Sequence, residues 1–294
     1  MLSSPSTIAG PVVPIPPGAA GSARFRGRLG SRNVTTAEPD DAGLRPVDVL
    51  TVISVVDPTP SVRRITLSGS TAAVAGAGPT VSLLVPRVGD DAPHWPRVAR
   101  DGRIVWPHGA HGVSLRSYTA RRQDVGRGEV EIDFVLHGDG PAAAWAAAAA
   151  PGSPLGVAGG GTLGDRPAAA LLLAGDETAL PAIHRILGAA APATQGVVLL
   201  EVAGPAEEQP LPVPEGMAVR WLHRGATAPG EGSLLADAVA ALDPFPGDVF
   251  AWVAAESGAV RTIRADLRGR WGLSRAQHHA IGYWRRGRAM SPAG

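Results

Sequence analysis

Hydrophobic and polar residues alternate over short distances in the first half of the chain. Residues 47–56 are rich in β-branched side chains, and residues 62–67 place Arg63 and Arg64 among apolar positions. A period of two that is interrupted often by turn residues predicts short strands in an antiparallel barrel. The predicted strands are residues 47–56, 62–67, 81–85, 104–106, 117–121 and 130–136. The first ends at the turn dipeptide Asp57-Pro58, and no helical period occurs before Pro141.

After Arg166 the pattern changes to continuous apolar runs that alternate with amphipathic stretches. Residues 168–174 are apolar throughout, as in a strand that is buried on both faces. Strands that alternate with helices predict a parallel sheet with right-handed crossovers. The predicted strands are residues 168–174, 197–202, 218–222, 249–254 and 279–284, and the predicted helices are residues 178–190, 233–242 and 258–270.

The two patterns together predict a β + α/β fold, in which an antiparallel barrel precedes a parallel-sheet α/β domain. We place the barrel at residues 45–165 and the α/β domain at residues 166–288, with tails at 1–44 and 289–294. The first tail is expected to be disordered. Its Pro, Gly, Ser and Ala residues, with Phe25 as the only aromatic residue, bury too little apolar surface to offset chain entropy.

Composition excludes several kinds of chemistry. All 27 basic residues are Arg, and both Lys and Cys are absent, which excludes lysine Schiff bases, disulfides, thiolate metal sites and cysteine nucleophiles. A net charge of +1 argues against nucleic-acid binding by bulk electrostatics. The longest apolar run, residues 142–150, is too short to span roughly 30 Å of hydrocarbon, and no signal peptide is evident. We expect a cytoplasmic monomer without a membrane span or a bound metal.

Two stretches lie where a helix follows a strand, and helix starts attract anions. In residues 175–178 (Gly-Asp-Glu-Thr), Asp176 or Thr178 could contact a nucleotide or simply cap the helix. A Gly-x-Gly-x-x-Gly fingerprint is absent there. Residues 137–141 (His-Gly-Asp-Gly-Pro) precede an Ala-rich helix, whose first N–H groups, at Ala142 to Ala144, would form an anion site beside His137. A structural role for that histidine is the alternative.

The most informative stretch is residues 116–119 (Arg-Ser-Tyr-Thr). In a strand, Arg116 and Tyr118 share one face while Thr119 points the other way. A cation, an aromatic ring and a hydroxyl suit a flavin that lies against a barrel. An edge strand that covers the surface with Arg and Tyr is the alternative.

Four ordered motifs resemble those of the siderophore-interacting proteins, which are flavin-dependent ferric-siderophore reductases of the ferredoxin–NADP reductase superfamily. They are residues 116–121 (Arg-Ser-Tyr-Thr-Ala-Arg), 133–139 (Asp-Phe-Val-Leu-His-Gly-Asp), 175–183 (Gly-Asp-Glu-Thr-Ala-Leu-Pro-Ala-Ile) and 282–287 (Gly-Tyr-Trp-Arg-Arg-Gly). Residues 251–254 (Ala-Trp-Val-Ala) together with Glu256 form a fifth, weaker match to the family. The resemblance covers residues 46–288 in all.

The resemblance implies an FAD-binding barrel and an NAD(P)-type domain. The implied FAD-contacting residues on the barrel are Arg116, Ser117, Tyr118, Thr119, His137, Asp139, Ala142, Ala143 and Ala144. The residues implied to line the interface where a reductant approaches the flavin are Glu177, Thr178 and Ala179. Tyr283 and Trp284 are implied to close the C-terminal side of the pocket. The implied function is reduction of ferric siderophores with electrons from NAD(P)H or ferredoxin. A flavin reductase or diaphorase, and a non-catalytic siderophore-binding protein with decayed cofactor sites, are the alternatives.

The chain departs from the family pattern at several positions. Ala143 and Ala144 stand where the family has a hydroxyl residue, Gly160 lies in place of an Arg-containing turn, and Ala255 replaces a Gly. The first two changes remove cofactor contacts, and the methyl group of Ala255 could crowd a nicotinamide nucleotide. Glu207 and Glu208 follow strand 197–202, and their negative charges argue against a 2′-phosphate site there and hence against NADPH. The alternatives are that these acids only face solvent, or that Arg220 or Arg224 of the next strand reaches the phosphate.

Overall fold

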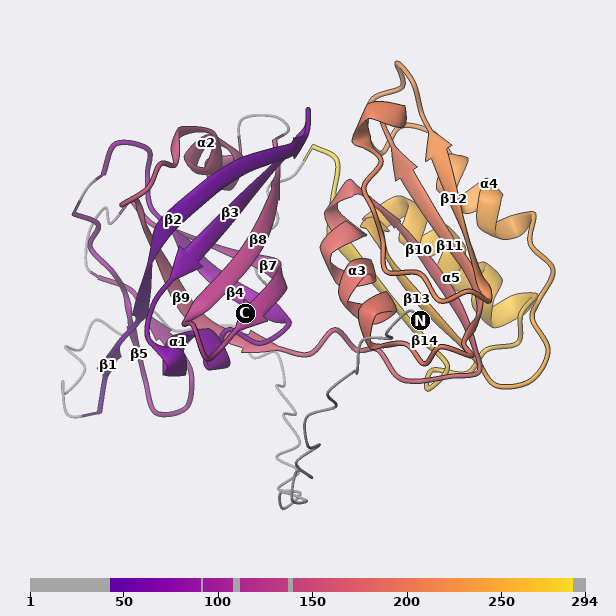
Figure 1. Cartoon of the computed structure of the whole chain (residues 1–294), viewed down its shortest axis with the longest axis horizontal. Helices are drawn as coiled ribbons and strands as arrows, with labels where there is room; N and C mark the ends of the chain where they lie inside the picture. Colours follow the sequence, from indigo (N-terminus) through magenta and orange to yellow (C-terminus); the bar gives the residue numbers. More distant parts are fainter. Residues whose placement is uncertain (1–42, 91, 108–111, 137–139, 288–294) are drawn as a thin grey trace, which may run out of the picture. The chain divides into compact units, whose positions relative to one another are not determined.

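A closed antiparallel barrel forms the N-terminal part of the protein (Figure 1). The computed structural model describes residues 43–90, 92–107, 112–136 and 140–287. Around the barrel the strands follow the order β2, β3, β8, β7, β4 and β9. Their bounds are β2 Asp48–Thr59, β3 Val62–Ser68, β8 Glu129–Val135, β7 Ser114–Asp124, β4 Thr80–Val85 and β9 Pro154–Gly161. The alternation in the sequence places Leu50, Ile65 and Leu83 in the barrel core, where each is fully buried.

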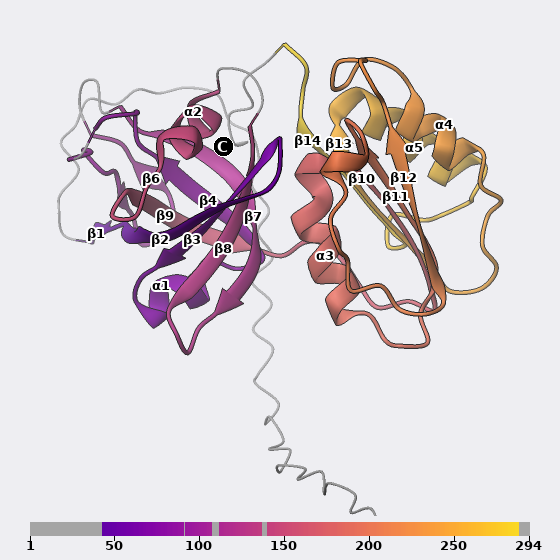
Figure 2. The same ribbon diagram turned by 45° about the horizontal axis from the view of Figure 1, so that its top comes forward.

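An aromatic chain crosses this core and positions helix α2 (Pro141–Ala148), which Figure 2 shows against the barrel strands. The ring of Tyr118 on β7 lies 4.6 Å from that of Phe134 on β8, centroid to centroid. Phe134 in turn lies 5.5 Å from Trp145 of α2. These contacts hold the start of α2 on the barrel that also carries the Arg116–Thr119 segment of β7.

Parts of the predicted barrel were wrong in detail. Strand β2 does not end at Asp57-Pro58 but continues to Thr59. Helix α1 (Thr71–Gly76) interrupts the strands well before Pro141; the Ser70 side chain caps it, and Ala73 and Val74 are buried in the barrel core. The Gly-rich strand β9 had no predicted counterpart. Three strands of two residues each form a small additional sheet: β1 (Arg45–Pro46), β5 (Arg97–Val98) and β6 (Ile104–Val105).

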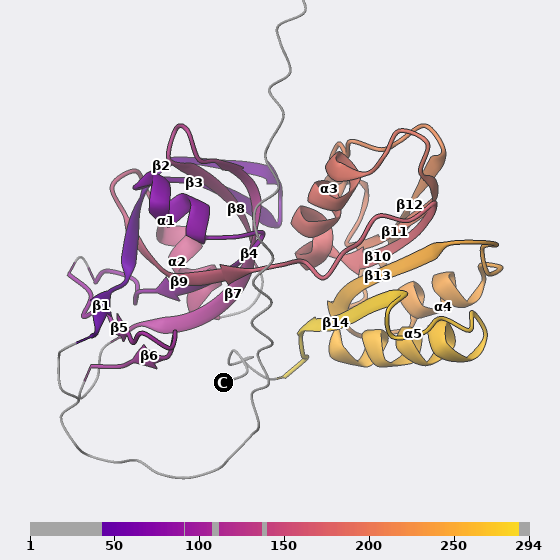
Figure 3. The same cartoon turned by 90° about the horizontal axis from the view of Figure 1, so that it is seen from below.

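The C-terminal part is a five-stranded parallel sheet with the order β12, β11, β10, β13, β14. The strands are β10 Ala170–Asp176, β11 Gln195–Val202, β12 Met217–His223, β13 Val249–Glu256 and β14 His278–Trp284. One face is covered by α3 (Leu180–Ala189), which follows the 3₁₀ turn η1 (Glu177–Ala179). The other face is covered by α4 (Leu234–Ala240) and α5 (Ser257–Gly269), as Figure 3 shows.

The predicted fold class is therefore confirmed. The domain boundaries stay predictions, and residues 1–42, 288–294 and the candidate site residues His137 and Asp139 lie outside the described part of the chain. Within that part, no helix has the length and apolarity needed to cross a membrane.

Hydrogen bonds connect the barrel to the sheet domain. The hydroxyl of Ser61 donates to Glu207 Oε2 at 2.6 Å, and Glu207 lies in the 3₁₀ turn η2 (Pro205–Glu207) after β11. Arg185 on α3 donates from Nη1 to the carbonyl oxygen of Ala120 at 2.9 Å. The described residues of the barrel and the sheet domain accordingly form one compact unit.

Candidate functional site

Strand β7 presents the Arg-Ser-Tyr-Thr motif at one end of the barrel. Tyr118 packs toward the barrel core, and burial raises the pKa of its hydroxyl to about 12. Arg116 is half-buried and donates from Nη1 to the carbonyl oxygen of Leu115 at 2.7 Å, which orients the guanidinium group. Ser117 is exposed, whereas Thr119 points out of the barrel and is only 5% exposed. The predicted alternation of faces along this strand is what the structure has.

The outward-facing Thr119 meets the last strand of the sheet. Its side chain lies beside that of Tyr283 on β14, and burial raises the pKa of the Tyr283 hydroxyl to about 12 although Thr119 lowers it. The Tyr283 ring makes an edge contact with Trp252, with centroids 6.1 Å apart. Trp252 is fully buried and donates from Nε1 to the carbonyl oxygen of Leu163, in the connection between barrel and sheet, at 2.8 Å. These contacts therefore bring together one cluster, which consists of Thr119, Leu163, Trp252 and Tyr283.

Helix α2 begins without a side-chain cap, because its N-cap residue is Gly140. Ala144 donates its N–H to the carbonyl oxygen of Gly140 at 2.9 Å, which makes it the first residue of the intrahelical bonding pattern. The earlier N–H groups, at Ala142 and Ala143, are those that lack intrahelical acceptors in any α-helix. Ala142 is buried, Ala143 is half-buried and Ala144 is exposed. Proline at the first position is suited to this start.

The turn after β10 uses its polar residues on each other. Asp176 is 5% exposed, and its Oδ1 accepts from the N–H of Thr178 at 3.0 Å and from its hydroxyl at 2.5 Å. The indole of Trp284 donates to Asp176 Oδ2 at 2.7 Å. Burial raises the pKa of Asp176 to about 6 despite these donors. Capping, one of the two roles expected for residues 175–178, is therefore what Asp176 does.

The two neighbours of Thr178 lie inside the sheet domain. Glu177 is 6% exposed and pairs with Arg224, which follows β12. Ala179 is fully buried in the core under α3. A Cβ atom on Gly175 would lie only 2.3 Å from that of Ala179, so the glycine permits a close approach of turn and strand.

The acids after β11 contact other residues of the protein. Glu207 is buried and accepts from Ser61 of the barrel, and Glu208 Oε1 lies 2.8 Å from Nε2 of His223. Solvent exposure, one of the two interpretations of these acids, therefore holds for Glu208 but not for Glu207, and the expected effect on a 2′-phosphate stays a prediction. Arg224, one of the cations that could have reached that phosphate, is occupied by Glu177.

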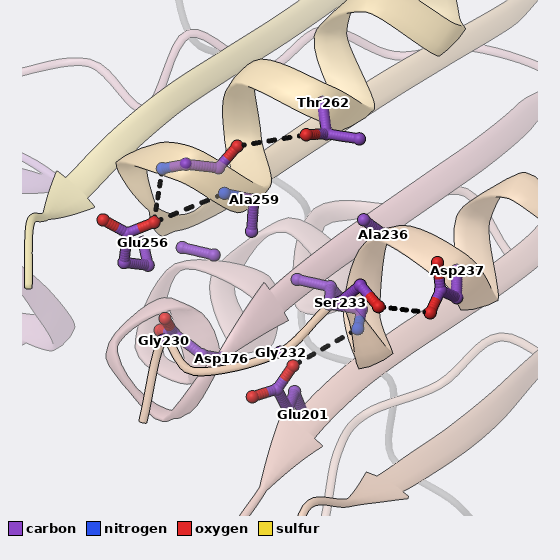
Figure 4. A pocket seen from close by; sticks show the side chains of 13 residues that line it. Asp176, Glu201, Gly230, Gly232, Ser233, Ala236, Asp237, Glu256, Ala259 and Thr262 are labelled. Carbon is purple, nitrogen blue, oxygen red and sulfur yellow. Dashed lines mark hydrogen bonds between the residues drawn. The ribbon is translucent and has the colours of Figure 1, made fainter. Parts of the chain in front are cut away.

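A pocket of about 210 Å³ lies at the carboxyl edge of the parallel sheet (Figure 4). It opens between the ends of β10, β11 and β13 and the starts of α4 and α5, where open α/β sheets bind ligands. Ala255, one of the departures from the family pattern, lines it, and the crowding of a nucleotide by its methyl group stays a prediction. Four carboxylates surround it, and Figure 4 shows them from four segments: Asp176, Glu201, Asp237 and Glu256.

A second polar cluster lies at the contact between barrel and sheet. Asp133 on β8 accepts from Arg64 Nε at 2.7 Å and Nη2 at 2.9 Å, and Arg121 Nη1 lies 3.8 Å from Asp133 Oδ2. His184 on α3 faces this cluster. Burial, together with the charges of Arg121 and Arg64, lowers the pKa of His184 to about 4, so the imidazole is neutral at pH 7.

The structure thus joins the candidates Thr119 and Tyr283, and it joins Trp284 to the turn that contains Thr178. Glu201 was missed, although a polar residue at the end of the apolar run 197–200 is a signal for the ligand edge of a parallel sheet. The pairing of Arg64 with Asp133 has no signal in the sequence, because residues 69 positions apart carry no local pattern.

A closed antiparallel barrel followed by a parallel α/β sheet is the arrangement of ferredoxin-reductase-type proteins. A ferredoxin NADP⁺ reductase from Neisseria gonorrhoeae with bound FAD and NADP has the same fold, with a TM-score of 0.52 and 13% identity over 80% of this chain and 98% of that one. The model of the siderophore-interacting FAD-binding domain matches residues 51–163, and that of the siderophore-interacting protein matches residues 168–287. The chain belongs to the siderophore-interacting protein family.

Individual relatives support this assignment. The chain is 36% identical to the ferric vibriobactin reductase ViuB of Vibrio cholerae over 64% of this chain and 70% of that protein. It is 39% identical to an uncharacterized protein of Mycobacterium tuberculosis over 59% of this chain, and spans 66% of that protein. A siderophore utilization protein from T. fusca has a TM-score of 0.72 at 34% identity, over 84% of this chain and 96% of that one.

The residues present fit FAD. The uncapped start of α2 and the guanidinium of Arg116 are hydrogen-bond donors of the kind that a pyrophosphate needs. The contact between α2 and β7 through Trp145, Phe134 and Tyr118 fixes these donors on one scaffold. The match to an FAD-binding domain model covers the same residues.

Proposed function

We propose that this protein is an FAD-dependent oxidoreductase that reduces ferric siderophores and thereby releases ferrous iron. The observation that carries the proposal is the Arg116–Thr119 strand, which bears a cation and an aromatic ring and places Thr119 beside Tyr283 of the last strand. Membership of the siderophore-interacting family and the resemblance to ViuB support the choice of substrate class.

Reduction is a release step for this substrate. Siderophore oxygen ligands hold hard ferric iron far more tightly than ferrous iron. FAD accepts two electrons as hydride and can pass them on singly, so that one two-electron donor reduces two ferric ions.

The chain's own residues then bind and orient. We assign the pyrophosphate of FAD to the amides of Ala142 and Ala143 and to Arg116. His137, Asp139, Ser117 and the exposed Ala144 remain proposed neighbours of the cofactor. Tyr283, locked between Thr119 and Trp252, and Trp284, held by Asp176, would close the C-terminal side of the flavin site. Thr178, Glu177 and Ala179 would support that side from behind, because the last two are buried.

Anaerobic turnover of the purified, FAD-loaded full chain tests the proposal. The acceptors are a catecholate and a hydroxamate ferric siderophore and a quinone, the donors are NADH, NADPH and reduced ferredoxin, and a ferrous-specific chelator reports the product. We expect ferrous iron to form from at least one siderophore class faster than the quinone is reduced. Quinone reduction alone would instead indicate a flavin reductase or diaphorase. Protein that neither binds FAD nor turns over, but still binds the siderophore, would indicate a non-catalytic binding protein.

Restoring a hydroxyl at the start of α2 is expected to tighten FAD binding. One added neutral hydrogen bond is worth about 0.5–1.5 kcal/mol, so Ala143→Ser should lower the Kd for FAD by roughly two- to ten-fold. The loss of helix propensity in the first turn costs only a few tenths of a kcal/mol. Fluorescence titration of apoprotein with FAD measures the effect, and Ala147→Ser, at an exposed position later in the same helix, is the control. If Ala143→Ser and the wild type bind FAD with equal affinity, the pyrophosphate does not bind at this helix start.

A further inference from the structure

The carboxyl edge of the parallel sheet is where this fold offers a place for a nucleotide diphosphate. Such sites depend on unpaired N–H groups at the starts of the elements that follow the strands, because these groups and the helix dipole attract phosphate. The pocket of about 210 Å³ lies at this edge. Whether a nucleotide can enter therefore depends on what the N–H groups around the pocket already bind.

Carboxylates of the chain itself occupy these N–H groups. Glu256 is the N-cap of α5, and its Oε2 accepts from the N–H of Gly258 and, at 3.3 Å, from that of Ala259 (Figure 4). Asp176 accepts from the N–H of Thr178 at the start of η1. Glu201 Oε2 accepts from the N–H of Leu235 at 3.2 Å. The start of α2 on the barrel, in contrast, has only Gly140 at its N-cap.

Glu256 is also held in position by its surroundings. A Cβ atom on Gly230 would lie 2.9 Å from Glu256 Cγ and 2.8 Å from the ring of Trp284, so this loop packs closely over both side chains. Glu256 Oε1 accepts from the N–H of Arg286 at 3.4 Å. A phosphate could reach the amides of Gly258 and Ala259 only by displacing a carboxylate that these contacts fix.

The charge of the pocket opposes a phosphate as well. Its lining contains Asp176, Glu201, Asp237 and Glu256 and, among the described residues, no Arg or His. Two cations of adjacent segments are engaged elsewhere, because Arg224 pairs with Glu177 and Arg286 pairs with Glu231. A pyrophosphate, with two negative charges, would enter a site that repels it at close range.

We propose that Glu256, supported by Asp176 and Glu201, is a specificity-determining residue that excludes pyridine nucleotides from this edge. Electrons would then reach the protein from a donor that places no pyrophosphate there, such as a reduced ferredoxin. Only the statement about the electron donor rests on the proposed function. The exclusion of a nucleotide from the pocket does not depend on it, because it concerns binding alone.

Calorimetric titration of the FAD-loaded protein with NADP⁺, NAD⁺ and ADP-ribose tests the exclusion without turnover. We expect no saturable binding to wild type at millimolar ligand. Glu256→Gln, which removes the charge but retains an acceptor, should tighten binding moderately. Glu256→Ala, which also frees the two amides, should tighten it by about ten-fold or more. Asp266→Asn removes the same charge from the later part of α5, where Asp266 pairs with Arg270 and does not line the pocket, and should change nothing.

Three results would overturn this inference independently of the proposed function. Micromolar binding of NADP⁺ or NAD⁺ to wild type, or a Glu256→Ala variant that binds no tighter, would overturn the exclusion even if ferric siderophores are reduced. The comparison requires that the Glu256→Ala variant is folded, which its flavin content and unfolding midpoint verify. If alanine disturbs α5, Glu256→Gln provides the same test. Reduced ferredoxin should support turnover by wild type where NADPH does not, and the reverse result would also overturn the inference.

Discussion

Arg116→Ala is expected to strip FAD from the purified protein while leaving its fold intact. A charge-assisted contact with a phosphate contributes about 1.5–3 kcal/mol, so the Kd for FAD should rise by roughly ten-fold or more. The fold should tolerate the change, because the guanidinium donates to the carbonyl oxygen of the adjacent Leu115, a contact within the same strand that joins no other element. Flavin absorbance per protein after gel filtration measures the effect, together with the unfolding midpoint.

Arg122→Ala provides a matched control on the same strand. Its side chain is 55% exposed and pairs with Glu131 on the surface of the barrel. Removing it deletes the same charge further along β7 and should leave FAD content unchanged. If Arg116→Ala retains flavin as well as Arg122→Ala does, the assignment of the Arg-Ser-Tyr-Thr motif to the cofactor is incorrect.

Asp133→Ala is expected to destabilise the protein strongly. The side chain of Asp133 is 3% exposed and binds Arg64 through both oxygens, with Arg121 Nη1 at 3.8 Å. Removing it leaves two guanidinium groups, whose side chains are 19% and 9% exposed, without their counter-ion. Breaking a buried pair from one side costs about 3–5 kcal/mol, which corresponds to a fall in Tm of roughly 10 °C.

The neighbouring residue pair supplies the control. Arg63 binds Asp57 with the same two-pronged geometry, at 2.8 and 3.0 Å, but the side chain of Asp57 is 53% exposed. Solvent screens such a pair, so Asp57→Ala should shift Tm little. Similar losses for both variants would mean that burial does not determine the contribution of the Asp133 cluster. Urea unfolding with a common m-value gives the comparison in free energy.

Both predictions concern residues whose positions in their strands could be read from the sequence but whose partners could not. The period of two predicted β7 and β8, and it placed Thr119 on the opposite face from Tyr118, as observed. The contact between Thr119 and Tyr283 joins residues far apart in the chain, and it forms because the last strand pairs with β13 beside the barrel. The roles proposed for the motif residues stay predictions until FAD binding is measured.

The elements that the sequence did not predict have related physical causes. Helix α1 has six residues, too few to show a period, and burial of Ala73 and Val74 in the barrel stabilises it. Strand β9 contains Gly159 to Gly161, which have low β-propensity, yet it pairs with both β2 and β4. A Cβ atom on Gly160 would lie 2.2 Å from the carbonyl oxygen of Ala77, so this close packing requires the glycine.

The sequence by itself determined the order and type of the main elements, since hydrophobic periodicity is a local property that follows from burial on one face or two. It also determined the family, through motifs whose residues are contiguous. Only the tertiary structure decided which polar groups satisfy one another. Glu256 on the amides of α5, Glu177 on Arg224 and Asp133 between Arg64 and Arg121 are pairings that depend on distance in space. Because a buried charge must find a partner wherever the fold provides one, these pairings, and the acidic character of the pocket they create, could not be inferred from the order of the residues.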